Sequence, residues 1–287
     1  MKIAVASGKG GTGKTMIATS LAAALAPNLD VQLIDCDVEA PNAHLFLHPQ
    51  IFDVKPANIN IPIIDHDHCI LCEQCVDLCE FNALAMLGER IEVFEQLCHG
   101  CGSCTIHCPV QAISEKPRKI GELKFGTFFN NHPFSYGELT VSEPMPTPII
   151  RQLKGYTKGN LEVTILDSPP GSSCPVVTTI HDADYLILVT EPTPFGLHDL
   201  KQMVGVLAET GTPGGLIINR DGIGDSSVEA YLSETPYPIL MKIPYQESIA
   251  VGLASGTLLI DIVPEFKKAL LNIYAAIKDH IDEGRVI

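Results

Sequence analysis

The feature that most constrains this chain is a glycine-rich loop near its start. Its residues fit the pattern G-x-x-x-x-G-K-S/T and are Gly8, Lys9, Gly10, Gly11, Thr12, Gly13, Lys14 and Thr15. An apolar run over residues 2–6 predicts a buried strand before the loop, and residues 14–26 predict a helix after it. In that setting the glycines let several backbone N–H groups face one anion, and the helix adds the positive end of its dipole. The sequence therefore predicts a site for the phosphates of ATP.

Two side chains of this loop are expected to act directly on the nucleotide. Lys14 is predicted to reach the β- and γ-phosphates, and the Thr15 hydroxyl to bind Mg²⁺. Lys9 is a second lysine directly after the first glycine of the loop. Its position is unusual, and it either serves the nucleotide or is a solvated loop residue.

Short apolar segments rich in Val, Ile and Leu recur along the chain and predict further buried strands. They cover residues 31–35, 163–167, 185–190, 215–219 and 238–241. Helical patterns such as residues 197–209 separate several of them, so we expect an α/β fold with a doubly wound, mostly parallel sheet. A last helix over residues 264–282 carries an apolar stripe expected to pack on the core. The stripe consists of Phe266, Leu270, Ile273, Ile277 and Ile281.

Carboxylates follow two of the predicted strands. Asp35 and Asp37 come after the second strand, and Asp167 ends a later strand and precedes Gly171 by four residues. One such aspartate can simply cap the next helix. Three of them in series after a phosphate loop favour a role in binding magnesium and positioning water, which phosphoryl transfer requires.

With Lys9 and these carboxylates, the chain resembles the MinD/Mrp/ParA family of P-loop ATPases, which have a deviant Walker A loop. The resemblance implies a homodimer around two ATP molecules, with Lys9 reaching the nucleotide of the partner. It implies that Asp37 orients or activates the attacking water and that Asp35 lies near the metal. Asp167 would hold Mg²⁺ through water, and the Gly171 N–H would sense the γ-phosphate.

The same resemblance implies an adenine site further along the chain. Asn219 and Arg220 end a predicted strand at the position where the family reads the base, and Pro244 belongs to a segment expected to pack on it. Asn219 alone is equally compatible with stabilising a turn.

Eight of the ten cysteines form two sets with the same C-x2-C-x2-C-x3-C spacing. The first set is Cys69, Cys72, Cys75 and Cys79, and the second is Cys98, Cys101, Cys104 and Cys108. This is the spacing of a two-cluster bacterial ferredoxin, in which the fourth cysteine of each set serves the other cluster. One 4Fe–4S cluster is therefore expected on Cys69, Cys72, Cys75 and Cys108. The other is expected on Cys98, Cys101, Cys104 and Cys79.

Zinc is the alternative metal for these thiolates. It does not require eight cysteines in crossed order, so we favour two 4Fe–4S clusters. The pattern departs from the ferredoxin pattern at Glu80, where a proline is expected, whereas Pro109 is present. Cys36 is predicted to be a packed thiol, and Cys174 has no second cysteine beside it with which to hold a further cluster between subunits.

The cysteine-rich segment predicts a small α+β ferredoxin-like domain inserted into the nucleotide-binding domain. We expect the first part of the P-loop domain over residues 1–59, the insert over 60–115, and the second part over 116–287, with 116–146 as a loop-and-hairpin return. The whole chain resembles MinD-superfamily ATPases that contain an inserted ferredoxin domain.

Composition narrows the possible partners and location. The net charge of −15 weighs against nucleic acid, because such binding needs a basic face. No apolar run of about 18 residues is present, which argues against membrane insertion. No secretory signal is visible, so a cytoplasmic location is expected.

These features favour an ATPase in which the nucleotide state gates electron transfer through the clusters to a redox partner protein, with slow hydrolysis where the partner is absent. An iron–sulfur carrier or assembly ATPase, like the Mrp relatives, is the first alternative. A regulatory or positioning switch, like MinD or ParA, is the second.

Overall fold

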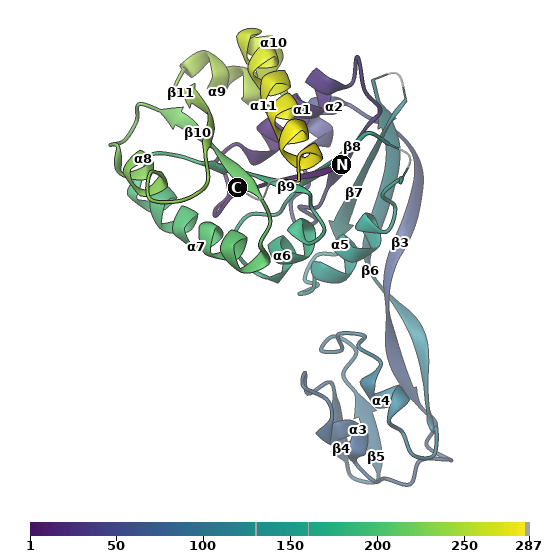
Figure 1. Cartoon of the computed structure of the whole chain (residues 1–287). Helices are drawn as coiled ribbons and strands as arrows, with labels where there is room; N and C mark the ends of the chain where they lie inside the picture. Colours follow the sequence, from purple (N-terminus) through teal and green to yellow (C-terminus); the bar gives the residue numbers. More distant parts are fainter. Residues whose placement is uncertain (130, 160, 285–287) are drawn as a thin grey trace.

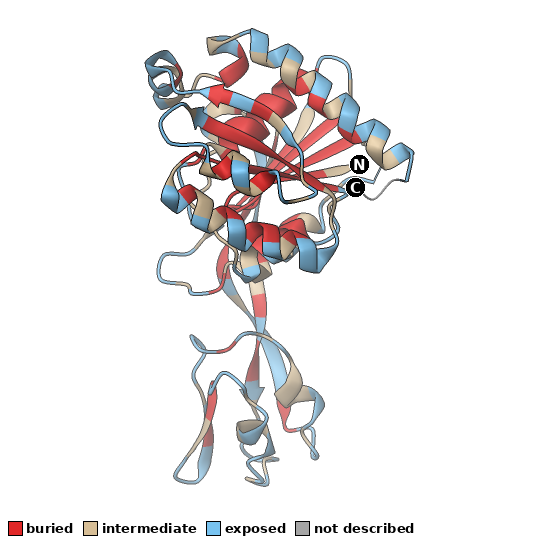
Figure 2. Ribbon diagram, turned by 60° about the vertical axis from the view of Figure 1, so that its left-hand side comes forward, coloured by how far each residue is buried: buried red, intermediate tan, exposed pale blue. Residues whose placement is uncertain are grey.

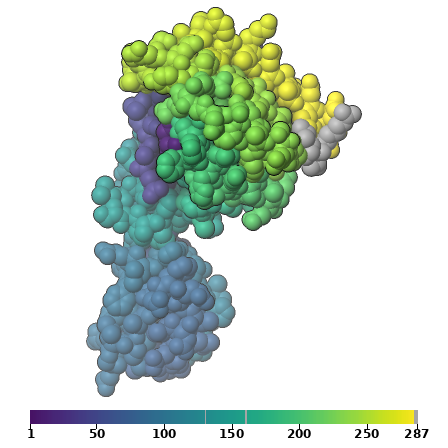
Figure 3. Space-filling model, turned by 90° about the vertical axis from the view of Figure 1, so that its left-hand side faces the viewer, coloured from purple at the N-terminus to yellow at the C-terminus, as the bar shows by residue number. Residues whose placement is uncertain are grey.

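The computed structural model of the chain describes residues 1–129, 131–159 and 161–284. Residues 130, 160 and 285–287, which belong to the expected second part of the P-loop domain, lie outside this description. The chain forms an α/β body and a smaller lobe that projects from it on a two-stranded ribbon (Figure 1). In the space-filling view the lobe is a distinct mass below the body (Figure 3).

The body is built on a sheet of nine strands in the order β11-β10-β9-β1-β8-β2-β7-β6-β3. Neighbours from β11 to β7 pair in parallel, whereas β7–β6 and β6–β3 pair antiparallel. The predicted strands are confirmed as β1 (Lys2–Ala6), β2 (Val31–Asp35), β8 (Val163–Asp167), β9 (Tyr185–Thr190), β10 (Gly214–Asp221) and β11 (Ile239–Pro244). The expected mostly parallel α/β sheet is therefore present.

Helices cover both faces of this sheet, as a doubly wound fold requires. One face carries α1 (Lys14–Leu25), α2 (His44–Leu47), α9 (Glu247–Ala254), α10 (Leu259–Ile262) and α11 (Glu265–Asp282). The other face carries α5 (Thr147–Lys154), α6 (Cys174–Ile180), α7 (Pro194–Thr210) and α8 (Ser227–Leu232). Strands β2, β8 and β9 are buried at every position, and β1 at all but Lys2, because helices lie on both sides of them (Figure 2).

The ribbon consists of β3 (Gln50–Ile64) and β6 (Ile113–Phe128), and β6 turns back into β7 (His132–Leu139). The hairpin expected within residues 116–146 is present, but β3 was not predicted as a strand. Its many exposed positions and its proline and asparagine residues weaken the strand signal. The expected domain boundaries at residues 60 and 115 both fall inside the ribbon, which continues from the body into the lobe.

The lobe consists of two similar halves, each with one short helix. It contains α3 (Gln74–Asp77), the hairpin of β4 (Leu84–Leu87) and β5 (Arg90–Val93), and α4 (Ser103–Ile106). The two short helices begin 29 residues apart, at Gln74 and Ser103, which is the spacing between the two cysteine sets.

Among the described residues, no helix combines the length and the apolar character needed to cross a bilayer.

The last helix is expected to contribute strongly to stability. Leu270 of α11 is fully buried in the core beside α1. Leu270→Ala should lower the free energy of unfolding by about 2–4 kcal/mol, because it removes buried methyl groups and leaves a cavity. Lys267→Ala, at an exposed site of the same helix, should change it by less than about 0.5 kcal/mol. Urea unfolding of both variants checks this, and equal losses would contradict a core role for the helix.

Candidate functional site

The glycine loop is tightly packed on one side and open on the other. Gly11 and Gly13 have φ angles of +78° and +100°, which favour glycine. A Cβ on Gly8 would lie 2.5 Å from the Cβ of Asp199, and a Cβ on Gly13 would lie 2.6 Å from Nδ2 of Asn219. Nothing lies within 4 Å of the corresponding positions on Gly10 and Gly11. The loop is therefore held by α7 and by the end of β10, and leaves its other side free for a ligand.

Lys14 is buried at the start of α1 and is paired with a carboxylate. Its Nζ donates to Oδ2 of Asp37 over 3.0 Å. Burial disfavours the charged form of Lys14, but the surrounding carboxylates outweigh burial and raise its pKa. The lysine predicted to hold phosphates thus contacts the aspartate predicted to position water.

Asp35 orders the segment that contains Asp37. Its Oδ1 accepts the Asp37 N–H over 3.0 Å, and its Oδ2 accepts the N–H groups of Asn42 and Ala43, each over 3.0 Å. In this structure Asp35 therefore shapes a loop, which the sequence did not predict. Burial, followed by repulsion from Asp167, raises the pKa of Asp35.

Asp167 lies beside Asp35, because the two residues are in register on neighbouring strands β8 and β2. It is fully buried, and neither carboxylate oxygen has a hydrogen-bond partner among the described residues. Burial raises the pKa of Asp167, although the charge of Lys14 opposes this. Three carboxylates share one ammonium group here, and the free oxygens of Asp167 are ligands of the kind that Mg²⁺ prefers. The donor set fits a divalent cation.

Gly171 has a φ angle of +101°, and its N–H donates to the carbonyl of Ser7 over 2.9 Å. The N–H predicted to sense the γ-phosphate is thus occupied by the strand end that leads into the glycine loop. It becomes available only if the Asp167–Gly171 segment moves.

Of the predicted adenine residues, Asn219 contacts the glycine loop itself. Asn219 donates from Nδ2 to the Thr12 carbonyl over 2.8 Å, and its Oδ1 accepts the Arg220 N–H over 2.9 Å. Pro244 ends β11 beside Asp221. The structure brings Asn219 to the loop, whereas Pro244 lies on the neighbouring strand end.

Glu191 is a residue of this site that the sequence reasoning missed. It follows β9 directly, is only 5% exposed, and pairs with both Lys9 and Arg220. The same signal that identified Asp35 and Asp167, an acid at the end of a predicted strand, also marks Glu191.

Two pockets in the lobe bring the cysteines together. The first is lined by Cys69, Cys72, Cys75 and Cys108. The second is lined by Cys79, Cys98, Cys101 and Cys104, and also by Cys75, which lines both pockets. Within the described residues, no three His, Cys, Asp or Glu side chains are arranged to hold a single metal ion. A four-iron cluster is larger than one ion, so it requires its thiolates to stand further apart.

The backbone around these pockets repeats with the spacing of the cysteines. Positive φ angles occur in pairs 29 residues apart, at Leu71 and Gly100, Glu73 and Gly102, and Asn82 and Gln111. The Ala83 N–H donates to Sγ of Cys79 and the Ala112 N–H to Sγ of Cys108, each over 3.3 Å. Non-glycine residues in this conformation are strained, and such strain gathers at functional sites.

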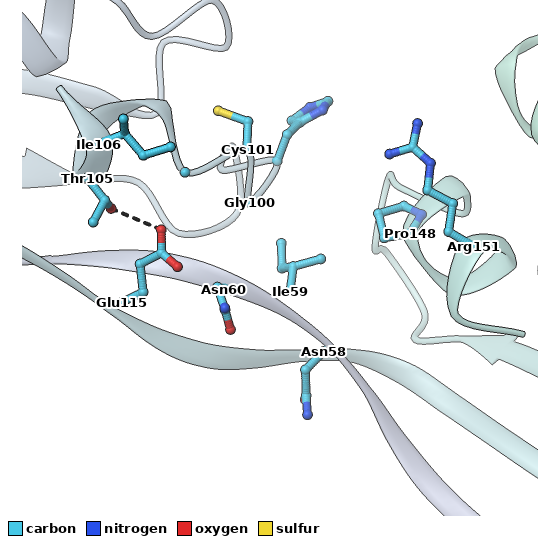
Figure 4. Close-up of a pocket in the computed structure, with 12 residues that line it drawn as sticks. Asn58, Ile59, Asn60, Gly100, Cys101, Thr105, Ile106, Glu115, Pro148 and Arg151 are labelled. Atoms are coloured by element: carbon cyan, nitrogen blue, oxygen red, sulfur yellow. Dashed lines mark hydrogen bonds between the residues drawn. The ribbon is translucent and has the colours of Figure 1, made fainter. Parts of the chain in front are cut away.

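A cleft of about 820 Å³ lies between the lobe and the body. Gly100 and Cys101 line it from the lobe, and Pro148 and Arg151 of α5 line it from the body (Figure 4). Arg151 is exposed and has no ion pair with any residue that the structure describes. The second cysteine pocket therefore lies on the body side of the lobe.

The two remaining cysteines differ in exposure. Cys36 is fully buried, and burial raises the pKa of its thiol, so it is the packed thiol that was predicted. Cys174 is exposed at the start of α6.

Comparison with known proteins identifies relatives of the whole chain. The family model for the CobQ/CobB/MinD/ParA nucleotide binding domain matches residues 3–259. An uncharacterized protein of Methanocaldococcus jannaschii is 31% identical over 98% of both chains. An iron–sulfur cluster carrier protein of Pyrococcus horikoshii is 26% identical over 74% of this chain and 58% of its own.

The fold also resembles solved structures. The septum site-determining protein MinD of Pyrococcus horikoshii, complexed with Mg-ADP, has a TM-score of 0.58 at 21% identity and covers 95% of this chain and 93% of its own. The family description names nucleotide binding and no iron–sulfur centre.

Asp167→Asn should raise the stability of the protein without nucleotide and abolish its stabilisation by Mg·ATP. Removing one of two adjacent buried carboxylates relieves repulsion, so the nucleotide-free variant should be about 1–2 kcal/mol more stable than the wild type. It should gain no stability from Mg·ATP. Thermal unfolding with and without Mg·ATP measures both effects, with Asp53→Asn, at a partly exposed site on β3, as control. A less stable variant that still responds to Mg·ATP would contradict the assignment.

Proposed function

Because the chain belongs to the CobQ/CobB/MinD/ParA nucleotide-binding family and is a MinD/ParA-type ATPase, we propose that its nucleotide state gates electron transfer through two 4Fe–4S clusters in the lobe. The acceptor is a redox partner protein, and the working unit is a homodimer around ATP. A reducing compartment such as the cytoplasm suits the free thiols. Nucleic acid and membrane insertion have no part in the proposal.

In the nucleotide half, binding of ATP exchanges one ion pair for another. Lys14 leaves Asp37 for the β- and γ-phosphates, which frees the Asp37 carboxylate to orient the attacking water. The Thr15 hydroxyl would hold Mg²⁺ directly, and the unpartnered oxygens of Asp167 would hold it through water. The metal supplies charge neutralisation at the phosphates, which phosphoryl transfer chiefly needs. ATP hydrolysis thus follows from groups already gathered at one sheet edge.

In the cluster half, one observation carries the proposal: the backbone and the cysteine sulfurs repeat together, 29 residues apart. The repeat includes strained φ angles and equivalent N–H···S bonds at Cys79 and Cys108. Hydrogen bonds to sulfur are one of the means by which proteins set cluster potentials. The crossed grouping of the thiols into two pockets supports the same assignment of ligands.

Helix α5 supports a physical connection between the two halves. Lys154 donates to the carbonyls of Thr178 and Thr179 at the end of α6, over 2.7 and 3.0 Å. Gln152 donates to the Asn58 carbonyl in the ribbon over 3.0 Å. Arg151 lines the cleft opposite Cys101. Since α6 follows the Asp167–Gly171 segment, movement of that segment would reach the cleft through α5.

A carrier or assembly ATPase for iron–sulfur clusters is the second candidate. It is favoured by the relatives named iron–sulfur cluster carrier proteins. Transfer of iron and sulfide from this chain to an apo-protein, at a rate that depends on ATP, would support it over electron transfer.

Iron content tests the cluster half. Anaerobically purified protein should contain about eight irons and eight sulfides per chain, and Cys101→Ser about half of them, because it removes a ligand of one cluster. Cys174→Ser, at an exposed cysteine outside the lobe, should keep the full content. Bound zinc in place of iron would contradict the proposal.

Redox titration tests the gating. Mg·ATP should shift the potential of at least one cluster by about 60 mV, which is tenfold in a one-electron equilibrium. Lys14→Ala should abolish nucleotide binding and therefore the shift. Lys154→Met should keep nucleotide binding and iron content and lose the shift, because α5 is no longer bonded to α6. If Mg·ATP left the reduction potentials of the wild-type clusters unchanged, the proposed gating would be wrong.

A further inference from the structure

One buried carboxylate holds two cations beside the glycine loop. Lys9 pairs with Oε1 of Glu191, and Nη1 of Arg220 lies 3.0 Å from Oε2. The Glu191 side chain is 6% exposed, whereas those of Lys9 and Arg220 are 32% and 46% exposed. The acid is therefore fixed inside the protein, and its two partners reach it from the surface.

We propose that Glu191 holds Lys9 inside its own subunit while the site is free of nucleotide, and that Arg220 keeps Glu191 paired when Lys9 leaves for the nucleotide of the partner subunit. Glu191 and Arg220 are thus positioning residues for the lysine. The inference rests on the ATP-bound homodimer of the proposed function. It gives Arg220 a role different from the adenine contact that the sequence suggested.

The reason lies in the cost of a buried charge. A carboxylate that is buried and loses its only partner is strongly destabilised, because neither water nor another cation compensates it. If Lys9 were the only partner of Glu191, its departure would oppose dimerisation. Arg220 already contacts the second oxygen, so Glu191 stays paired. A guanidinium suits this role because it stays charged and its several donors fit a carboxylate.

The glycine loop determines where both cations stand. The Ser7 hydroxyl donates to the Lys9 carbonyl over 2.7 Å, so the Lys9 backbone is anchored and its side chain is the part that turns. The Arg220 N–H is bonded to Asn219, which in turn is bonded to the Thr12 carbonyl. Arg220 also has a φ angle of +55°, which directs the chain away from the regular strand. The glycine loop therefore fixes the position of Arg220 beside Glu191 through its hydrogen bond with Asn219.

A set of variants with effects of opposite sign tests the proposal. Sedimentation velocity would measure the dimer dissociation constant with Mg²⁺ and a non-hydrolysable ATP analogue. Glu191→Gln should lower the dissociation constant by about tenfold, because Lys9 is no longer held by the carboxylate. Arg220→Met should raise the dissociation constant by about tenfold, because Lys9 is then the only partner of Glu191 and cannot leave it. The double variant, with both substitutions, should have the same lowered dissociation constant as Glu191→Gln. Glu229→Gln, at a site on α8 that loses its ion pair with Lys242 of β11, should match the wild type.

The double variant distinguishes this role from an adenine contact. If Arg220 acted only on the base, the double variant would dimerise as poorly as Arg220→Met, and the proposal would be overturned. An unchanged dissociation constant in Glu191→Gln would overturn it as well.

A second measurement does not depend on the dimer. In nucleotide-free protein, acetylation of Lys9 by an amine-reactive reagent, followed by mass spectrometry, should be faster in Glu191→Gln and in the double variant, and slower in Arg220→Met. Equal rates in all variants would show that Glu191 does not hold Lys9. If this pattern holds but wild-type protein stays monomeric with nucleotide, the dimer of the proposed function is wrong, and so is the transfer of Lys9 to a partner.

Discussion

The crowding of buried carboxylates around Lys14 is the interaction on which the nucleotide site depends. Asp35 and Asp167 stand side by side because β2 and β8 are neighbours in register, and Asp37 adds a third charge against a single ammonium group. Such an arrangement is costly in a low dielectric. This cost is offset when a divalent cation binds the carboxylates and phosphates bind Lys14. The protein supplies only one ammonium group for three carboxylates, so the site favours a ligand that brings further positive charge.

The same region connects to the rest of the molecule through hydrogen bonds that a ligand would compete with. Gly171 gives its N–H to Ser7, and Lys14 gives its ammonium to Asp37. Both groups are expected to face phosphates in the bound state. Lys14 and the Gly171 N–H therefore already have protein partners, which phosphates would have to replace. Exchange of those partners provides the energy difference between states that any nucleotide-driven change requires.

The lobe is stabilised differently from the body. Its hairpin and two short helices are small, and much of its surface is exposed, so its apolar core alone contributes little. Metal clusters commonly stabilise domains of this size. The ribbon of β3 and β6 joins it to the edge of the body sheet, where α5 contacts the ribbon and α6 together. This placement gives the lobe a continuous series of contacts toward the nucleotide site, through the ribbon, α5 and α6.

The sequence by itself determined the features that depend on neighbours along the chain. The glycine loop, the six predicted parallel strands and the duplicated cysteines all follow from local spacing and period. Only the tertiary structure decided which groups meet: Lys9 with Glu191, Lys14 with Asp37, the Gly171 N–H with Ser7, and α5 with both α6 and the ribbon. The missed strand β3 belongs to the same class, because its partner β6 begins about fifty residues later along the chain. These contacts depend on the order of strands in the sheet, and strand order is set by packing across the whole body, which no local pattern encodes.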